Sequence, residues 1–236
     1  MAIIIYGKNA VRESLKVNRV EKLYVQDTLK EDELFLRTKK SGIKTEFRDK
    51  EQLTRMAKNP SHQGFVAICK EVRPLTLDEL LTRIDSPEPL LLMLDGIEDP
   101  HNFGAILRTC DALGIDGVIY PSHRAVALNS TVYKVSTGAI NYVNIAEVNN
   151  LSRTIERLKK EGYWIVSADG EGTTDFRDVD YHGPICLITG SEGFGISKNV
   201  LKNSDFIVKI PMKGHVNSLN VSVATAILLS HIVFSR

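Results

Sequence analysis

The chain has 236 residues, of which 43% are hydrophobic and 25% charged, so it can bury one large core or two small ones. It contains no apolar run long enough for a membrane span, and its first residues lack the pattern of a signal peptide, so we expect neither. Cys69, Cys110 and Cys186 are far apart and set among apolar residues, which predicts buried thiols in a reducing, cytoplasmic compartment.

The net charge of +1 hides an asymmetry along the chain. Residues 1–85 contain 17 Lys and Arg against 13 Asp and Glu, a net charge of +4, whereas residues 86–236 contain 13 against 16, a net charge of −3. An ordinary solvated surface would permit this imbalance. It also fits an N-terminal part that contacts a polyanion.

The first 72 residues alternate between strand and helix patterns. Apolar and β-branched runs predict four strands, and apolar residues at helical spacing predict three helices between them. The strands are expected at 3–6, 22–26, 43–47 and 64–69, and the helices at 9–17, 31–40 and 50–58. This alternation predicts a small α/β layered domain over residues 1–72.

Residues 73–89 have the composition of a linker with one short helix. Pro74, Pro87 and Pro89 bracket a helical pattern at 76–84. Thr76 is expected to cap this helix, with Glu79 as its capping-box partner.

A second, larger domain is expected over residues 90–236. Strand-like runs occur at 90–94, 117–120, 142–145, 163–168, 185–189 and 206–210, with helical patterns at 103–113, 151–160 and the C-terminus. Strands that alternate with helices predict a parallel sheet covered on both faces. The last helix, which we expect Ser218 and Asn220 to open, is apolar almost all round and is therefore predicted to be buried.

Three polar clusters could carry chemistry. Asn102 and Arg108 follow the first strand of the larger domain, although a helix cap and a surface ion pair with Asp111 are the plainer readings of these two residues. A glycine-rich turn, residues 190–195, follows the strand at 185–189 and would let a ligand approach the backbone closely. It matches neither a Walker loop nor a dinucleotide fingerprint, and a simple tight turn would explain it. Ser218 could be only an N-cap.

The histidines are not spaced as metal ligands, so we expect no metal site. No Gly-x-Ser-x-Gly elbow is present either, which disfavours nucleophilic hydrolysis.

Taken together, the three clusters resemble the motifs of the SpoU/TrmH family of RNA ribose 2′-O-methyltransferases, in the SPOUT class. The family's Asn-x-Gly-x-x-x-Arg element is matched at residues 102–108 and its Gly-x-Glu-Gly element at 190–193. Its Ile-Pro-Met and Ser-Leu-Asn elements are matched at 210–212 and 218–220. The opening segments at 6–15 and 62–64 look like the small domain, similar to ribosomal protein L30e, of the RlmB-like subgroup.

The resemblance implies an architecture and a cofactor. Residues 1–72 would be an L30e-like RNA-binding domain, 73–89 a linker, and 90–236 an α/β methyltransferase domain with a deep C-terminal trefoil knot. The family also implies a homodimer and S-adenosyl-L-methionine as methyl donor, held by main-chain groups around Gly190, Ile210 and Leu219.

By the same resemblance, Arg108 is the catalytic residue. Asn102, Glu192, Ser218 and Asn220 would position Arg108 and the substrate. Because a guanidinium stays protonated in proteins, a role as a fork that binds phosphate and stabilises developing alkoxide charge is physically easier than a role as base.

The implied substrate is the ribose of a guanosine in 23S ribosomal RNA, since tRNA enzymes of this family generally lack the L30e-like domain. A tRNA methyltransferase, an rRNA enzyme with another target nucleotide, and an inactive RNA-binding assembly factor are the alternatives. A conventional Rossmann methyltransferase is disfavoured because its glycine loop would follow the first strand, where residues 95–102 lie.

Overall fold

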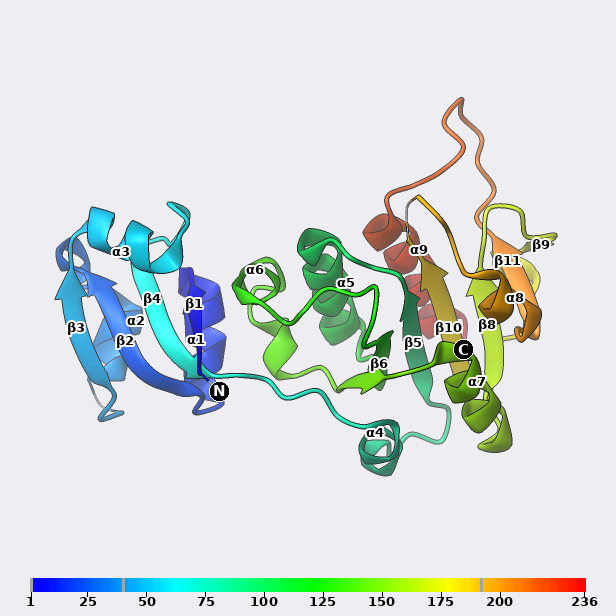
Figure 1. The fold of residues 1–236 in the computed structure, drawn as a ribbon, viewed down its shortest axis with the longest axis horizontal. Helices are drawn as coiled ribbons and strands as arrows, with labels where there is room; N and C mark the ends of the chain where they lie inside the picture. The colour runs from blue at the N-terminus through cyan, green and yellow to red at the C-terminus, as the bar shows by residue number, and fades with distance from the viewer. Residues whose placement is uncertain (1, 40, 192) are drawn as a thin grey trace. The chain divides into compact units, whose positions relative to one another are not determined.

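The computed structural model describes residues 2–39, 41–191 and 193–236 (Figure 1). The chain forms two compact units: residues 1–73 with 128–142, and residues 74–127 with 143–236.

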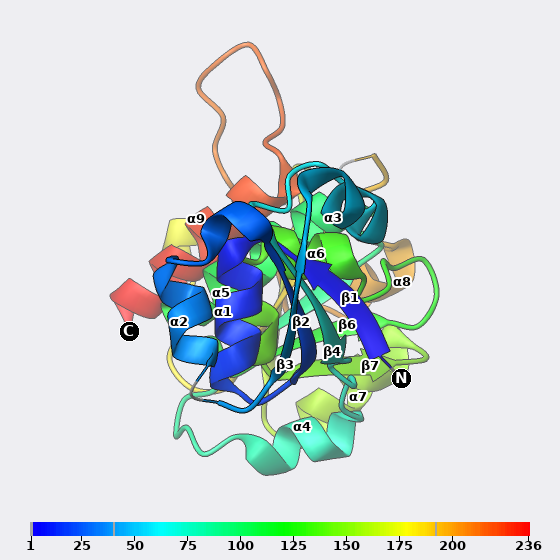
Figure 2. The same cartoon turned by 90° about the vertical axis from the view of Figure 1, so that its left-hand side faces the viewer.

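The N-terminal unit is a four-stranded sheet in the order β1-β4-β2-β3, in which β2 and β3 are parallel and the other neighbours antiparallel. Helices α1 and α2 lie on one face of this sheet and α3 on the other, as Figure 2 shows. The predicted elements of this region are confirmed with shifted ends: β1 Ala2–Tyr6, α1 Lys8–Lys16, β2 Val20–Gln26, α2 Glu33–Thr38, β3 Lys44–Arg48, α3 Lys50–Ala57 and β4 Phe65–Lys70.

Residues 128–142 pack with the N-terminal unit although they lie far along the chain. They form α6 (Ser130–Val135) and a 3₁₀ turn, Ala139–Asn141, neither of which the sequence analysis expected. Tyr133 is fully buried, and its hydroxyl accepts a hydrogen bond from the backbone N–H of Val72 at 2.8 Å. The strand expected at 142–145 is wrong, because Tyr142 ends the turn and the strand β7 spans Ile145–Val148.

The larger unit is built on a seven-stranded parallel sheet in the order β7-β6-β5-β10-β8-β11-β9. The predicted α/β class with a parallel sheet is confirmed, whereas the trefoil knot stays a prediction. The strands are β5 Leu90–Asp95, β6 Gly117–Pro121, β7, β8 Trp164–Ala168, β9 Thr174–Asp175, β10 Ile185–Gly190 and β11 Phe206–Lys209.

Helices cover both faces of the parallel sheet. Helix α9 (Val221–Ser235) packs against α5 (Pro100–Leu113) and β10, so the end of the chain returns from β11 to the middle of the sheet. The other face carries α4 (Leu77–Arg83), α7 (Leu151–Lys160) and α8 (Lys198–Lys202), whose apolar side chains join one core with β5, β8 and β10. The predicted Thr76–Glu79 capping box at α4 is confirmed.

Helix α9 corrects two expectations. It spans Val221–Ser235, and its N-cap is Asn220, whose side chain accepts from the N–H groups of Ser222 and Val223. Ser218 therefore does not cap it. The helix is apolar all round as predicted, but it is not buried all round, because Val223, Ile227 and Phe234 are 46%, 38% and 76% exposed.

Within the described ranges, no helix is long and apolar enough to cross a membrane. The three cysteines are buried and unpaired, as the sequence predicted, and burial raises the pKa of the Cys69 thiol to about 12.

Candidate functional site

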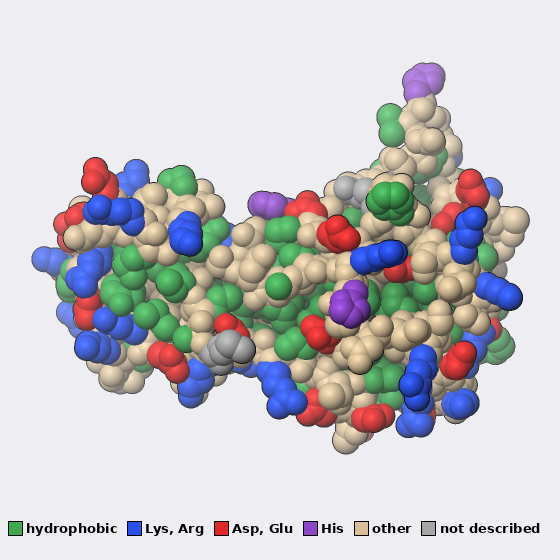
Figure 3. All heavy atoms as spheres, in the orientation of Figure 1, with side chains coloured by type: hydrophobic (Ala, Val, Ile, Leu, Met, Phe, Trp, Pro, Cys, Tyr) green, Lys and Arg blue, Asp and Glu red, His purple; other side chains and the backbone are tan. Residues whose placement is uncertain are grey.

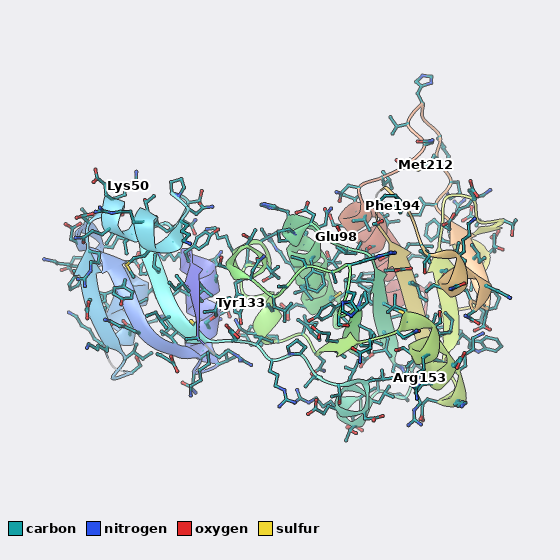
Figure 4. All side chains as sticks on the ribbon, in the orientation of Figure 1. Lys50, Glu98, Tyr133, Arg153, Phe194 and Met212 are labelled. Carbon is teal, nitrogen blue, oxygen red and sulfur yellow. The ribbon has the colours of Figure 1, made fainter. Side chains whose placement is uncertain are left out.

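The polar loops of the larger unit gather at the edge of the sheet where its strands end. Because all seven strands are parallel, the loops after β5, β10 and β11 leave from the same edge, which is where ligands bind in such sheets. Figure 4 labels one residue from each loop, Glu98, Phe194 and Met212, at this end. Phe194 is 97% exposed.

A hydrogen bond joins the first and third predicted motifs. The Asn220 side-chain Nδ2 donates to Asn102 Oδ1 at 2.9 Å, across 118 positions of sequence. Asn102 lies in the first turn of α5 and is 9% exposed. It is not the helix cap, since Asp99 accepts from the N–H of His101 and Pro100 occupies the first turn.

Two further bonds fasten the loops to one another. Asp95, the last residue of β5, accepts from the backbone N–H of Ser197 at 2.8 Å, which ties the first motif to the segment after the glycine turn. Thr225 in α9 donates its hydroxyl to Thr189 at 3.3 Å, and both side chains are buried. The second motif is thus held to the helix that the third motif begins.

Backbone hydrogen bonds join the two ends of the glycine turn. Ser191 and Gly195 exchange two backbone hydrogen bonds of 3.1 and 2.9 Å. A Cβ placed on Gly190 would lie 2.2 Å from the carbonyl of Gly195, so only glycine fits there. Gly193, by contrast, faces open space. Gly190 is therefore needed for the close approach of two backbone segments.

The remaining predicted residues are placed as follows. Arg108 is exposed on α5, on the C-terminal side of Asn102 in the same helix. Ile210 directly follows β11, and residues 211–220, which include Ser218 and Leu219, are exposed and carry no regular structure. Glu192 lies outside the described residues.

In the described part of the chain, no group of three or more His, Cys, Asp or Glu side chains is placed to hold a metal. Cys110 and Cys186 are fully buried, and burial raises the pKa of both thiols, which keeps them protonated.

Comparison with known proteins decides the family. Residues 89–230 match the model of the SpoU rRNA Methylase family, and residues 4–75 match the model described as RNA 2′-O ribose methyltransferase substrate binding. The chain belongs to the SpoU rRNA Methylase family. It is 40% identical to a protein of Staphylococcus saprophyticus named as a TrmH-family tRNA/rRNA methyltransferase, over 99% of this chain and 96% of that protein.

Solved structures of RNA-modifying enzymes share the fold. The AdoMet-bound rRNA methyltransferase of Sinorhizobium meliloti is 22% identical and covers 98% of this chain and 86% of its own, with a TM-score of 0.80. The A. aeolicus TrmH/SpoU tRNA-modifying enzyme is 34% identical but covers only 63% of this chain and 76% of its own, with a TM-score of 0.58.

Sequence reasoning missed the residues that hold the SpoU loops together. Asp95 directly follows the strand expected at 90–94, and a carboxylate at that position was a signal for an anchored loop. Thr225 was a second signal for a residue that anchors the loops, because it places a hydroxyl group within an almost wholly apolar helix.

Proposed function

We propose that this SpoU-family protein transfers the methyl group of S-adenosyl-L-methionine to a ribose 2′-hydroxyl of RNA. The observation that carries the proposal is the hydrogen bond between Asn102 and Asn220. It supports the view that the first and third motifs form one site with the glycine turn beside them.

The loops at the carboxyl edge suit this cofactor. Main-chain groups near Gly190, Ile210 and Leu219 are the groups that would hold it. Met212 and Leu219 are 38% and 36% exposed, so they offer apolar surface that an adenine ring could cover. Gly193 and Gly214 border open space, where a Cβ would meet no atom within 4 Å. When bound, the cofactor supplies an electrophilic methyl group on its sulfonium.

The protein's own contribution is to orient and stabilise. Arg108 would bind the phosphate next to the target ribose with its guanidinium and stabilise negative charge that develops on the 2′-oxygen. Asn102 and Asn220 would hold α5 and the start of α9 in a fixed position relative to each other. Ser218 and Glu192 are proposed as further positioning groups.

A single-turnover assay with Arg108 variants tests this mechanism. We expect Arg108→Ala to reduce methylation by at least about 100-fold, the scale of losing one charge-stabilising donor, while cofactor affinity stays within a few-fold. Arg108→Lys should also fail, because a point charge cannot replace a bidentate fork. Near-normal rates in either variant would reject this role.

For the substrate, we propose a guanosine of 23S rRNA. The support is that the rRNA enzyme of S. meliloti aligns with nearly the whole chain, whereas the tRNA enzyme of A. aeolicus leaves over a third of it unmatched. Residues 1–72, with their excess of cations, would supply RNA affinity through phosphate contacts. Mapping ribose methylation on rRNA and tRNA from cells with and without the gene would identify the target.

We further propose that the protein is a homodimer and that the larger domain, residues 90–236, is knotted. The exposed apolar side chains of α9 support the dimer, because a soluble monomer seldom leaves such a stripe uncovered.

A further inference from the structure

A row of side chains crosses all four strands of the N-terminal sheet and is open to solvent. Ile4 on β1 stands opposite Ile68 on β4. Lys22 on β2 also stands opposite Ile68, and Lys44 on β3 is opposite Lys22. Residues opposite one another on neighbouring strands point to the same face of a sheet, so these four side chains form a single row, the open row. Ile4 and Lys44 are exposed, and Ile68 and Lys22 are partly exposed.

Helix α3 covers the neighbouring row on the same face. Tyr6, Val66 and Tyr24 form that row and are buried in one apolar cluster with residues of α3. Figure 3 shows the area below α3, where hydrophobic side chains reach the surface and Lys and Arg side chains lie at their border. The open row therefore lies directly beside the area that α3 covers, on a mixed apolar and cationic surface.

This face of the sheet has an excess of positive charge. The register places four cations on it, Lys22, Lys44, Arg48 and Lys70, and one acid, Glu46. The carboxylate of Glu46 is 2.7 Å from the ammonium of Lys22 and also pairs with Arg48, so it is already bound within the face. Lys44 and Lys70 are exposed and offer a ligand two ammonium groups.

The charge is confined to one side of the sheet. None of the residues that the described register places on the opposite face, where α1 and α2 lie, is charged. The excess of cations extends to the whole unit, because residues 1–73 with 128–142 contain 17 Lys and Arg against 10 Asp and Glu, whereas the other unit contains 13 against 19. The N-terminal unit is thus the part of the chain that attracts polyanions.

RNA is the occupant that this combination of charge and apolar surface fits. Its phosphates would meet the ammonium groups of Lys44 and Lys70, and the carbon atoms of its riboses would cover Ile4 and Ile68. Tyr24, the aromatic residue beside the open row, is only 8% exposed, so its ring offers no platform for base stacking. Such a face holds the backbone of RNA and does not read its sequence.

We infer that the open row and Lys70 form a surface that binds the sugar-phosphate backbone of the RNA substrate. The inference rests on the proposed function, because it assigns a defined face of the N-terminal unit to the RNA affinity proposed for residues 1–72. Charge complementarity selects RNA over a second copy of the chain, since two copies of this face would bring like charges together.

The salt dependence of RNA binding tests the inference. The affinity of the full-length protein for a short labelled RNA without secondary structure is measured by fluorescence anisotropy over a range of salt concentrations. The Lys44→Ala, Lys70→Ala double variant should lower the slope of log affinity against log salt by about 0.7 for each lost phosphate contact. Both residues are exposed, so their substitution should leave the melting temperature of the protein nearly unchanged.

The Lys30→Ala, Lys39→Ala double variant is the matched control, because it removes the same charge from the same unit. Lys30 lies over the ring of Phe47 and Lys39 over that of Phe35, at 5.4 and 5.0 Å from the ring centroids. Phe47 points to the opposite face of the sheet, and the ring of Phe35 packs edge-on against it. The control should keep the wild-type slope.

Equal slopes in the two double variants, whether lowered or not, would overturn the inference, since the position of the charge would then have no effect. Methylation of RNA by the wild type would leave the proposed function standing in that case, so the two failures are distinguishable.

A second pair of variants tests the apolar part of the surface. Ile4→Glu places a carboxylate beside the proposed phosphates and should weaken RNA binding on the order of tenfold. Leu36→Glu is its control, since Leu36 is 39% exposed on α2, against 40% for Ile4, and should leave the affinity unchanged. Light scattering on both variants reports whether a second copy covers the face. Wild-type RNA affinity in Ile4→Glu, or a lower molecular mass in that variant than in the wild type, would overturn the inference.

Discussion

At the scale of single residues, Asn220 performs two tasks. Its Oδ1 caps α9 by accepting from the backbone N–H groups of the first turn, while its Nδ2 donates to Asn102. These tasks can be separated, because serine is about as good an N-cap as asparagine but is too short to reach across to Asn102.

We predict that Asn220→Ser keeps most of the stability and loses activity. Asn220→Ala should lose both, with a stability cost of about 1 kcal/mol for the missing cap. Thermal unfolding and single-turnover methylation, measured on both variants, check this. Should the serine variant methylate RNA at the wild-type rate, the bond to Asn102 would have no catalytic importance.

His62 is expected to make the stability of the N-terminal unit depend on pH. Its side chain is buried, its Nδ1 accepts from the N–H of Gly64 at 3.0 Å, and burial lowers its pKa below the ordinary 6.5. As the pH falls below about 6.5, the unfolded chain takes up a proton before the folded one does, so the free energy of unfolding decreases until the folded-state pKa is passed.

We therefore expect the melting temperature of the wild type to fall between pH 7.5 and 5 more steeply than that of His62→Asn. Asparagine can still accept from Gly64 but does not titrate in this range. Parallel slopes for the two proteins in calorimetry would exclude His62 as a source of the pH dependence.

At the scale of elements, hydrophobic periodicity predicted the helix whose apolar pattern lies in adjacent residues. It failed for a helix that packs against residues far away in the sequence. The helix at Leu151–Lys160 was predicted to the residue, since its apolar positions and its flanking turns can be recognised from neighbouring residues alone. Helix α6 was missed because Val132 and Tyr133 are buried against residues from the other end of the chain. That tertiary partner leaves no periodic pattern in a six-residue helix.

The glycine turn allows a matched pair of substitutions. Gly190→Ala would force its Cβ to within 2.2 Å of Gly195 backbone atoms, so the two segments must separate, at a cost of about 1–3 kcal/mol. Gly193→Ala has open space at its Cβ and should leave the melting temperature nearly unchanged. Thermal unfolding of both variants decides the matter, and an equal effect of the two would mean that the close packing at Gly190 is not what holds the turn.

At the scale of the whole molecule, the site could not be predicted from spacing. Asn102 and Asn220 are 118 positions apart, and only the resemblance to a family suggested that they meet. A parallel sheet predicts that strand-end loops share one edge, but not which strands are neighbours. The insertion of β10 between β5 and β8 brings the glycine turn beside Asp95, and that order is a property of the assembled sheet.

The exposed face of α9 provides the last prediction. Val223, Ile227 and Phe234 follow one another at helical spacing on a helix whose other side packs on α5 and β10. If a second copy covers this stripe, Ile227→Asp must bury a charge in an apolar interface and should convert dimer to monomer. Light scattering at micromolar concentration measures the mass, and Leu36→Asp, equally exposed on α2, is the control. A wild-type protein that is monomeric under these conditions, or an Ile227→Asp variant that remains dimeric, would place the interface elsewhere.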